Sequence, residues 1–270
     1  MKRQALKEVI DKHLGSIKKC CDRMPGCFDQ DDIHDLRVDY KKTRAFLRLL
    51  QLEKDSGDLQ LPDKLKAVYQ TGGKVRDLQL FLAQLHTLPV VNEIPACIAR
   101  WKKQLFAYKE QAVVAIEEMN FKKIWQDIIN ELPGELKDDT VKKFLHRKVA
   151  AIHIILLAAD DEDDLHSVRK QLKDIIYVIR IYENDWGIPF PISDWNEKEL
   201  SELASQLGDF NDRCISISLL QSGYIEEIGE IGENERTNLL ALRNQWLKEK
   251  NGQEQQLLKL IRELKMGHAF

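Results

Sequence analysis

The chain has 270 residues, of which 41 are Lys or Arg and 44 are Asp or Glu, so its formal net charge at pH 7 is −3. Proteins that bind nucleic acid without sequence preference usually carry a clear excess of basic residues. The nearly equal numbers of basic and acidic residues exclude a protein surface that is basic throughout. Affinity for anions would therefore need a local concentration of positive charge. The length suits one large domain or two small ones, and a composition with 31% charged residues, 13 Gly and 7 Pro is typical of a helical protein.

Nothing in the sequence indicates disulfide bonds, a targeting segment or a membrane span. The five cysteines are an odd number without metal-ligand spacing, which indicates reduced thiols in a cytoplasmic protein. The N-terminal residues 1–15 are amphipathic, and no apolar run approaches membrane-spanning length. We therefore expect a soluble cytoplasmic protein with no membrane association, no metal and no cofactor.

Hydrophobic periodicity predicts helices along most of the chain and no strand. Apolar residues from Leu6 to Ile17 recur at helical spacing in the first helix. The second helix is expected to begin after the break at Met24-Pro25-Gly26, with Asp31 or Asp32 as its N-terminal cap. The predicted helical segments are 3–21, 33–52, 62–85, 96–132, 140–159, 163–182, 197–221 and 236–264.

Several segments are predicted to interrupt these helices. Gly72-Gly73 is expected to break or bend the third one, and Pro133-Gly134 to stop the helical pattern of the first half. Residues 133–139 are expected to join the two halves, and residues 160–164 to form an acidic helix start. Residues 185–191 are predicted to be a loop and residues 223–234 a connection on the surface. A kink is expected at residues 251–252.

The helix over residues 33–52 carries a basic stripe. His34, Arg37, Lys41, Arg44 and Arg48 recur at steps of three and four, which places them on one narrow face. Apolar residues lie on both flanks of this face. A solvated charged face would instead lie opposite the apolar residues.

The outward position of this helix is assigned to Asp35, Asp39 and Lys42, so the basic stripe is expected to point towards the protein or into a cleft. Like charges at this spacing destabilise a helix by roughly 0.2–0.5 kcal/mol per pair, and desolvation adds to the cost. Either internal carboxylates or an anionic ligand must offset it.

A second stripe of the same kind follows in residues 163–182. His166, Arg169, Lys173 and Arg180 each lie 132 positions after a basic residue of the first stripe. Ile176 departs from the pattern, because it stands where the first stripe has its fourth member. The flanking apolar residues recur as well.

A glycine and an aspartate follow each stripe at the same spacing, in GKVRD and GDFND. Gly73 and Gly208 are 135 positions apart, as are Asp77 and Asp212. With the two stripes, this indicates an internal duplication with a period of about half the chain.

The two H-x-x-R-x-x-x-K helices, each followed by a G-x-x-x-D turn, resemble the CHAD domain, the conserved histidine α-helical domain, over nearly the whole chain. The resemblance implies an all-α fold with two antiparallel four-helix-bundle-like halves, related by a pseudo-twofold around a basic central cavity. It also implies one CHAD domain over residues 1–270, with helical repeats at 1–133 and 134–270. Members of the family bind inorganic polyphosphate without catalysis, so the resemblance implies this partner and an association with polyphosphate granules.

Carried over by position, the matching residues are His34, Arg37, Lys41 and Arg44 in the first helix and His166, Arg169, Lys173 and Tyr177 in the second. The family usually has a basic residue at the position of Ile176. The whole predicted polyphosphate-binding set is His34, Arg37, Lys41, Arg44, Arg48, Lys74, Arg76, His166, Arg169, Lys170, Lys173, Tyr177 and Arg180.

Other residues are predicted to support this set. Lys148 and Arg213 are candidate contacts at its rim. Asp77, Asn211 and Asp212 could hold basic side chains in orientation, although a role in helix capping or a turn is equally open for them.

Three alternatives stay open. A phosphohydrolase or another polyphosphate-processing enzyme would need a metal or a nucleophile beside the basic cradle, and the sequence has no P-loop and no H-E-x-x-H pattern. A helical protein-interaction scaffold would have its stripe paired with carboxylates. RNA recognition normally adds stacking aromatic residues, whereas aliphatic residues interleave these stripes, so we expect no specific nucleic-acid partner.

Overall fold

The structure is a computed structural model that describes residues 1–157, 159, 161–190, 197–221 and 232–263. Within these ranges the chain forms nine α-helices, a 3₁₀ helix and a π-helical turn, with no strand, which confirms the all-helical prediction. In chain order they are α1 (Arg3–Cys27), α2 (Gln30–Leu50), α3 (Asp63–His86), η1 (Pro89–Glu93), α4 (Pro95–Glu117), α5 (Phe121–Asn130), α6 (Asp138–Leu157), α7 (Glu162–Arg180), η2 (Ile181–Asp185), α8 (Glu197–Gln221) and α9 (Glu233–Glu263).

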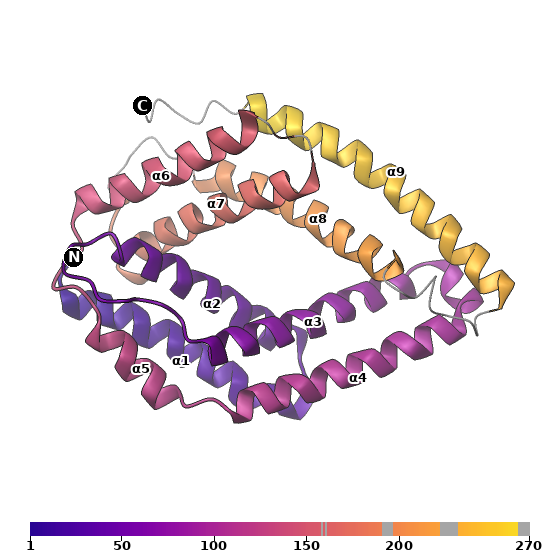
Figure 1. Ribbon diagram of the computed structural model, residues 1–270, viewed down its shortest axis with the longest axis horizontal. Coiled ribbons are helices and arrows are strands. Elements are labelled where there is room, and N and C mark those ends of the chain that lie inside the picture. The colour runs from indigo at the N-terminus through magenta and orange to yellow at the C-terminus, as the bar shows by residue number, and fades with distance from the viewer. Residues whose placement is uncertain (158, 160, 191–196, 222–231, 264–270) are drawn as a thin grey trace.

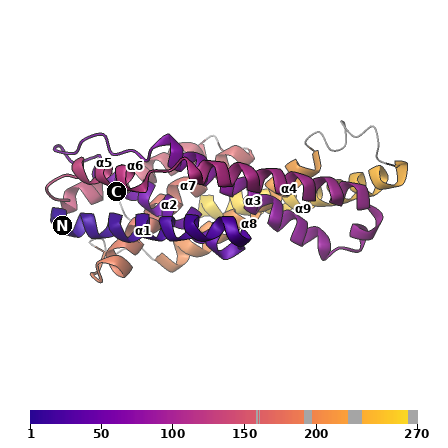
Figure 2. The same ribbon diagram turned by 90° about the horizontal axis from the view of Figure 1, so that it is seen from below.

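Most helices pack on the next helix in the sequence, whereas α5 packs on α1. α1 packs on α2, α2 on α3 and α3 on α4; in the same way α6 packs on α7, α7 on α8 and α8 on α9. The halves meet where α2 lies beside α7 and where α3 approaches α8, and the other helices lie outside these four (Figure 1). The loop end of α3 and α4 and the start of α9 extend beyond the rest, which makes the molecule elongated (Figure 2).

Two apolar cores stabilise this arrangement. The larger core includes residues of α1, α2, α6 and α7, and the predicted apolar stripe of the first helix is buried in it, with Leu6 and Ile10 fully covered. The smaller core joins α3, α4, α8 and α9. There the ring of Phe81 meets Trp101 and Trp246 edge-on, at centroid distances of 4.8 and 6.2 Å.

The ends of the first two helices differ from the prediction. α1 continues through Pro25, because a proline in the last turn removes only one hydrogen bond, and it ends where Phe28 adopts a left-handed conformation with φ 52°. The cap of α2 is Asp29, whose side chain accepts hydrogen bonds from the backbone N–H groups of Asp31 and Asp32 at 2.8 and 3.3 Å.

Two further boundaries also differ. The segment 96–132 is two helices, because the side chain of Asn120 accepts a hydrogen bond from Lys123 N–H at 3.0 Å and starts α5 there. α9 passes without interruption through the predicted kink at Asn251-Gly252. Most of the predicted connection at 223–234 lies outside the described residues, and the division of the chain after residue 133 stays a prediction.

The prediction that Asp39 faces outward is wrong, because this carboxylate is buried against α1. The ring of His13 lies 2.8 Å from Asp39 Oδ1 through Nδ1 and 2.9 Å from Asp185 Oδ2 through Nε2. Burial lowers the pKa of His13, but hydrogen bonding to Asp185 and Asp39 and their charges outweigh it, so the pKa is raised. The His13 ring therefore ties α1 to α2 and to the turn after α7.

Candidate anion site between α2 and α7

Basic residues of α2 and α7 meet along the line where these two helices pack together. The effect of these neighbouring charges on one another is clearest in the pKa of Lys41. Burial and the charges of Arg37, Arg169, Lys173 and Arg44 lower the pKa of its ammonium group to about 7. Two segments far apart in the sequence therefore contribute cations to one site.

Ion pairs neutralise the C-terminal ends of both stripes. Arg48 Nη1 donates to Asp174 Oδ2 over 3.0 Å, and Lys148 Nζ donates to the same oxygen over 2.6 Å. Arg180 donates from Nε and Nη2 to Glu197 Oε1 over 2.9 and 2.8 Å. At these ends the stripes are part of an internal salt-bridge network.

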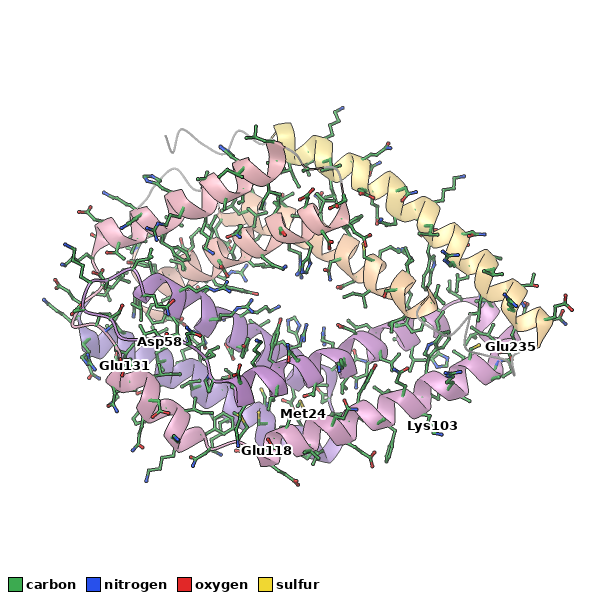
Figure 3. The ribbon with its side chains drawn as sticks, in the orientation of Figure 1. Met24, Asp58, Lys103, Glu118, Glu131 and Glu235 are labelled. Atoms are coloured by element: carbon green, nitrogen blue, oxygen red, sulfur yellow. The ribbon has the colours of Figure 1, made fainter. Side chains whose placement is uncertain are left out.

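The middle of the two stripes has no such neutralisation. Within the described part of the chain, no carboxylate lies within 4.0 Å of five basic residues, which we call the central cation cluster: Arg37, Lys41, Arg44, Arg169 and Lys173. The Nε atoms of Arg44 and Arg169 are buried and find no acceptor there. A buried donor without a partner costs about 1–3 kcal/mol, and more when charged. By contrast, Lys103 within α4 and Glu118 directly after its last residue are exposed on the outer side of the molecule (Figure 3).

Two stacked tyrosines support the α2 side of the central cation cluster. Tyr40 of α2 and Tyr69 of α3 stack with ring centroids 4.2 Å apart. The guanidinium group of Arg37 lies 4.7 Å from the Tyr69 ring centroid and donates to the Tyr69 carbonyl oxygen over 3.1 Å, and Arg44 lies 5.7 Å from the Tyr40 ring. Contact with a ring face holds a cation without neutralising it. Our sequence analysis assigned no role to Tyr69, although it lies one helical turn before Gly73 and so on the same face of α3.

The glycine of each G-x-x-x-D turn lies beside the arginine of the corresponding stripe. The predicted break of the third helix at Gly72-Gly73 does not occur, because α3 continues through both residues; a bend there stays a prediction. A Cβ atom on Gly73 would overlap Nη1 of Arg37, and one on Gly208 would lie 3.7 Å from Nη2 of Arg169. The missing side chain at residue 73 therefore leaves the space that Arg37 occupies.

Replacement of Gly73 by alanine is expected to lower the affinity for polyanions by about 10-fold, because Arg37 must leave its position on Tyr69. The free energy of unfolding should not fall, because alanine in a helix interior is favoured over glycine by about 0.5–1 kcal/mol. Gly72→Ala is the matched control, since its Cβ would meet only Ile33 Cγ2 at 3.8 Å. Calorimetric titration and thermal denaturation of both variants test this, and an equal loss of affinity in both would contradict it.

The two histidines of the motif lie near the N-terminal ends of the basic helices. Partial burial and the charges of Arg76 and Lys41 lower the pKa of His34. The pKa of His166 is also lowered, mainly by burial, and its Nδ1–H donates to Asn211 Oδ1 over 2.7 Å. Both rings are therefore neutral at pH 7, and a nearby anion would favour their charged forms.

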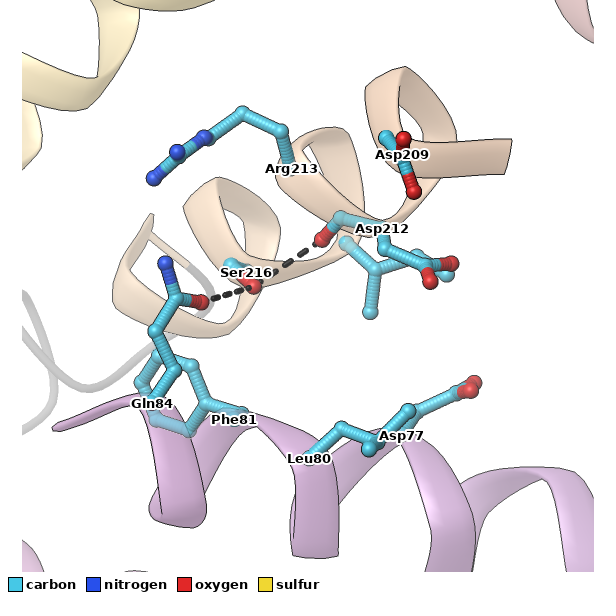
Figure 4. A pocket seen from close by; sticks show the side chains of 9 residues that line it. Asp77, Leu80, Phe81, Gln84, Asp209, Asp212, Arg213 and Ser216 are labelled. Carbon is cyan, nitrogen blue, oxygen red and sulfur yellow. Dashed lines mark hydrogen bonds between the residues drawn. The ribbon is translucent and has the colours of Figure 1, made fainter. Parts of the chain in front are cut away.

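Asp77 of α3 and Asp212 of α8 face each other where these helices approach (Figure 4). Burial raises the pKa of Asp77, and the charge of Asp212 adds to this effect. The charges of Arg37, Arg76 and Lys41 oppose it without reversing it. Asp77 therefore lies near the central cation cluster but is a poor counterion for it.

A cavity of about 240 Å³ lies beside this acidic pair. Asp77, Asp209 and Asp212 all line it, and within it the Ser216 hydroxyl group lies 2.9 Å from the carbonyl oxygen of Asp212 and 3.2 Å from Gln84 Oε1 (Figure 4). Arg213 is the one basic residue of the lining. Because three carboxylates face one guanidinium group, this space does not suit a polyanion.

Some members of the predicted binding set lie away from the central cation cluster. Lys74 is exposed and lies 5.5 Å from the ring centroid of Tyr108 on α4. Lys170 is exposed as well. Arg213, which is outside this set and was predicted as a rim contact, forms an ion pair with Glu249 of α9 at 3.3 Å. These side chains could reach a long ligand only at its periphery.

The remaining members differ in burial. Arg76 donates to the carbonyl oxygen of Gln30 over 2.7 Å, which places it at the start of α2 beside His34. Tyr177 is buried, and burial raises the pKa of its hydroxyl group to about 12. Ile176 is fully buried, so α7 contributes two members of the central cation cluster where α2 contributes three.

In the part of the chain that the structure describes, no group of three or more His, Cys, Asp or Glu side chains could hold a metal ion. None of the helices described there combines the length and the apolar character that crossing a bilayer requires.

The fold and the site together define an all-helical protein in which two basic helices pack side by side around unpaired cations. A sequence profile of the CHAD domain matches residues 8–221, and the chain belongs to this family. The crystal structure of the CHAD domain from the plant Ricinus communis has a similar fold, with a TM-score of 0.70 and 17% sequence identity over 95% of this chain and 91% of that chain. A comparison with curated protein sequences finds no match.

Proposed function

We propose that this CHAD domain binds linear inorganic polyphosphate, or a similar polyanion, between α2 and α7, and that it makes or breaks no bond in the ligand. The observation that carries the proposal is the central cation cluster, whose charges no carboxylate of the described chain neutralises. Arginine binds phosphate through a planar fork and lysine as a mobile point charge. A row of cations on each of two facing helices matches a row of anionic phosphates.

The proposal includes the internal duplication, with a pseudo-twofold that relates the halves and a basic cavity between α2 and α7. The shared packing order of the helices in both halves supports it. So does the position of Gly73 beside Arg37 and of Gly208 beside Arg169. In this arrangement each half contributes one basic helix to a single site.

The structure bears differently on the alternative functions. An interaction scaffold would have its stripes neutralised by carboxylates, which holds at the C-terminal ends and not in the middle. An RNA site would need accessible rings for stacking, whereas Tyr40 is only 3% exposed and is stacked on Tyr69. A polyphosphate-processing enzyme is the second candidate, and recovery of intact polymer tests it. Binding would place the protein in the cytoplasm, in association with polyphosphate granules.

A calorimetric titration with long-chain polyphosphate tests the proposal. Orthophosphate, triphosphate and a single-stranded RNA of similar charge serve as comparison ligands. Tight binding of the long chain, with the polymer recovered intact, is the expected result. Heat from RNA alone, or shortening of the polymer, would contradict the proposal.

The affinity is expected to fall with rising pH because of Lys41. Its pKa is lowered to about 7 in the free protein, with burial as the main cause, and a bound polyanion favours the charged form. Binding therefore takes up a proton, and between pH 7 and 8.5 the affinity should fall roughly 10-fold. The two histidines of the motif do not contribute in this range, because the pKa values of His34 and His166 are lowered from the ordinary histidine value.

Titrations in buffers with different ionisation enthalpies measure this proton uptake. The matched variant is Lys41→Arg, which keeps a positive charge at all these pH values. Its affinity should be almost independent of pH between 7 and 8.5. An unchanged pH dependence in this variant would assign the proton to another group.

A further inference from the structure

Lys41 lies at the centre of the central cation cluster. Arg37 and Arg44 lie one helical turn before and after it on α2, and Arg169 and Lys173 act on it from α7. No carboxylate of the described residues lies within 4.0 Å of its ammonium group. Lys41 is thus a partly exposed amine with four cationic neighbours and no counterion.

This environment favours the neutral amine. Burial and the four neighbouring charges lower the pKa of Lys41 to about 7, so about half of the molecules carry an uncharged, nucleophilic amine at neutral pH. The opposing group is Asp77 of α3, and burial raises the pKa of that carboxyl group. A desolvated lysine beside other cations is a recognised way for a protein to activate an amine.

The neighbours of this amine are suited to hold a phosphate group. Arg37 and Arg169 provide planar guanidinium groups, which match the geometry of phosphate, and Nε of Arg169 is buried without an acceptor in the described chain. A small molecule with a phosphate next to an electrophilic carbon would thus be held with that carbon close to the amine. We propose that Lys41 is a modification site that small acyl phosphates acylate, and that this modification switches off anion binding by the central cation cluster.

The reaction is a transfer of the acyl group from phosphate to nitrogen. The amine of Lys41 attacks the acyl carbon and a C–N bond forms. The bond between the acyl carbon and the phosphate oxygen breaks, and inorganic phosphate leaves with the electron pair. The proton lost by nitrogen passes to the phosphate or to water, so no oxidant, reductant or further reactant is needed.

The regulatory consequence rests on the proposed function. Acylation removes the positive charge of the side chain and leaves a neutral amide among the other four cations. A bound polyanion has the opposite effect on the modification, because it covers the amine and favours its protonated form. Polyphosphate binding and acylation of Lys41 would therefore exclude each other.

The test is incubation of the protein with acetyl phosphate at pH 7.5, with the initial acetylation rate of each lysine measured by peptide mass spectrometry. Lys42 and Lys143 are the matched comparisons: Lys42 is next in sequence and lies 3.9 Å from Asp39, and Lys143 is exposed on α6. We expect Lys41 to react about 10-fold faster than both. Arg169→Gln should reduce this difference more strongly with acetyl phosphate than with an uncharged acetylating ester, because the effect of Arg169 on the pKa of Lys41 is lost with both reagents and the phosphate contact only with the first.

Equal or slower acetylation of Lys41 than of Lys42 and Lys143 would overturn the inference. The test of this inference is independent of the test of the proposed function, because long-chain polyphosphate is titrated separately into the unmodified protein. Selective acetylation without any binding of polyphosphate would leave Lys41 as a modification site and refute only the regulatory consequence. Where both hold, Lys41→Gln should weaken binding, and polyphosphate should slow acetylation of Lys41 in the wild-type protein.

Discussion

Replacement of Arg169 by glutamate is expected to weaken binding of long-chain polyphosphate by more than about 100-fold. A hydrogen bond to a charged group contributes roughly 1.5–3 kcal/mol, and charge reversal replaces this attraction with repulsion of similar size. A large effect is expected at Arg169 because its buried Nε has no acceptor among the described residues and because it belongs to the central cation cluster, where no carboxylate of those residues forms an ion pair. Calorimetric titration measures the loss, and Arg37→Glu should behave in the same way.

Arg147 provides a matched control for both reversals. It is exposed on α6, so Arg147→Glu changes the net charge by the same amount without altering the central cation cluster. Its affinity for polyphosphate should stay within about 3-fold of the wild-type value at moderate salt. Helical content by circular dichroism should be unchanged in all three variants. A comparable loss of affinity in Arg147→Glu would mean that overall charge, and not the site between α2 and α7, governs binding.

The basic stripes could be predicted from sequence because helical periodicity depends only on the spacing of residues along the chain. The sequence also showed that the second stripe repeats the first. It could not show which members are neutralised, since the partners Asp174 and Glu197 reach Arg48 and Arg180 through tertiary packing. The same limit explains the error at Asp39, whose partner His13 belongs to another helix.

The role of Gly73 shows a second kind of limit. A glycine pair inside a helical pattern usually indicates a weak or bent helix, and a break or bend was therefore predicted at Gly72-Gly73. In the structure the absent side chain makes room for Arg37, a contact between helices that no local pattern encodes. Tyr69 was missed for the same reason, because its importance lies in the cation that packs on its ring.

Ile176 makes the two halves of the site unequal. It is fully buried, and no side chain of α7 replaces the cation that Arg44 supplies on α2. Because ion pairs also neutralise Arg48 and Arg180, five cations have no carboxylate within 4.0 Å among the described residues, where the sequence alone predicted a longer continuous row. The number of phosphates that the protein neutralises should therefore be smaller than the number of basic residues in the two stripes.

The salt dependence of binding measures this number. For a flexible single-stranded polyanion the logarithm of the affinity falls with the logarithm of salt concentration, with a slope of about −0.7 for each neutralised phosphate. Five contacts predict a slope near −3.5 and a loss of about 100-fold between 50 and 200 mM salt. If the ion pairs at the C-terminal ends opened to engage the ligand, six to ten contacts would be made, and with the same slope per phosphate the loss would reach roughly 300-fold to 16,000-fold. Titration at four salt concentrations distinguishes the two cases, and a slope near zero would exclude electrostatic capture altogether.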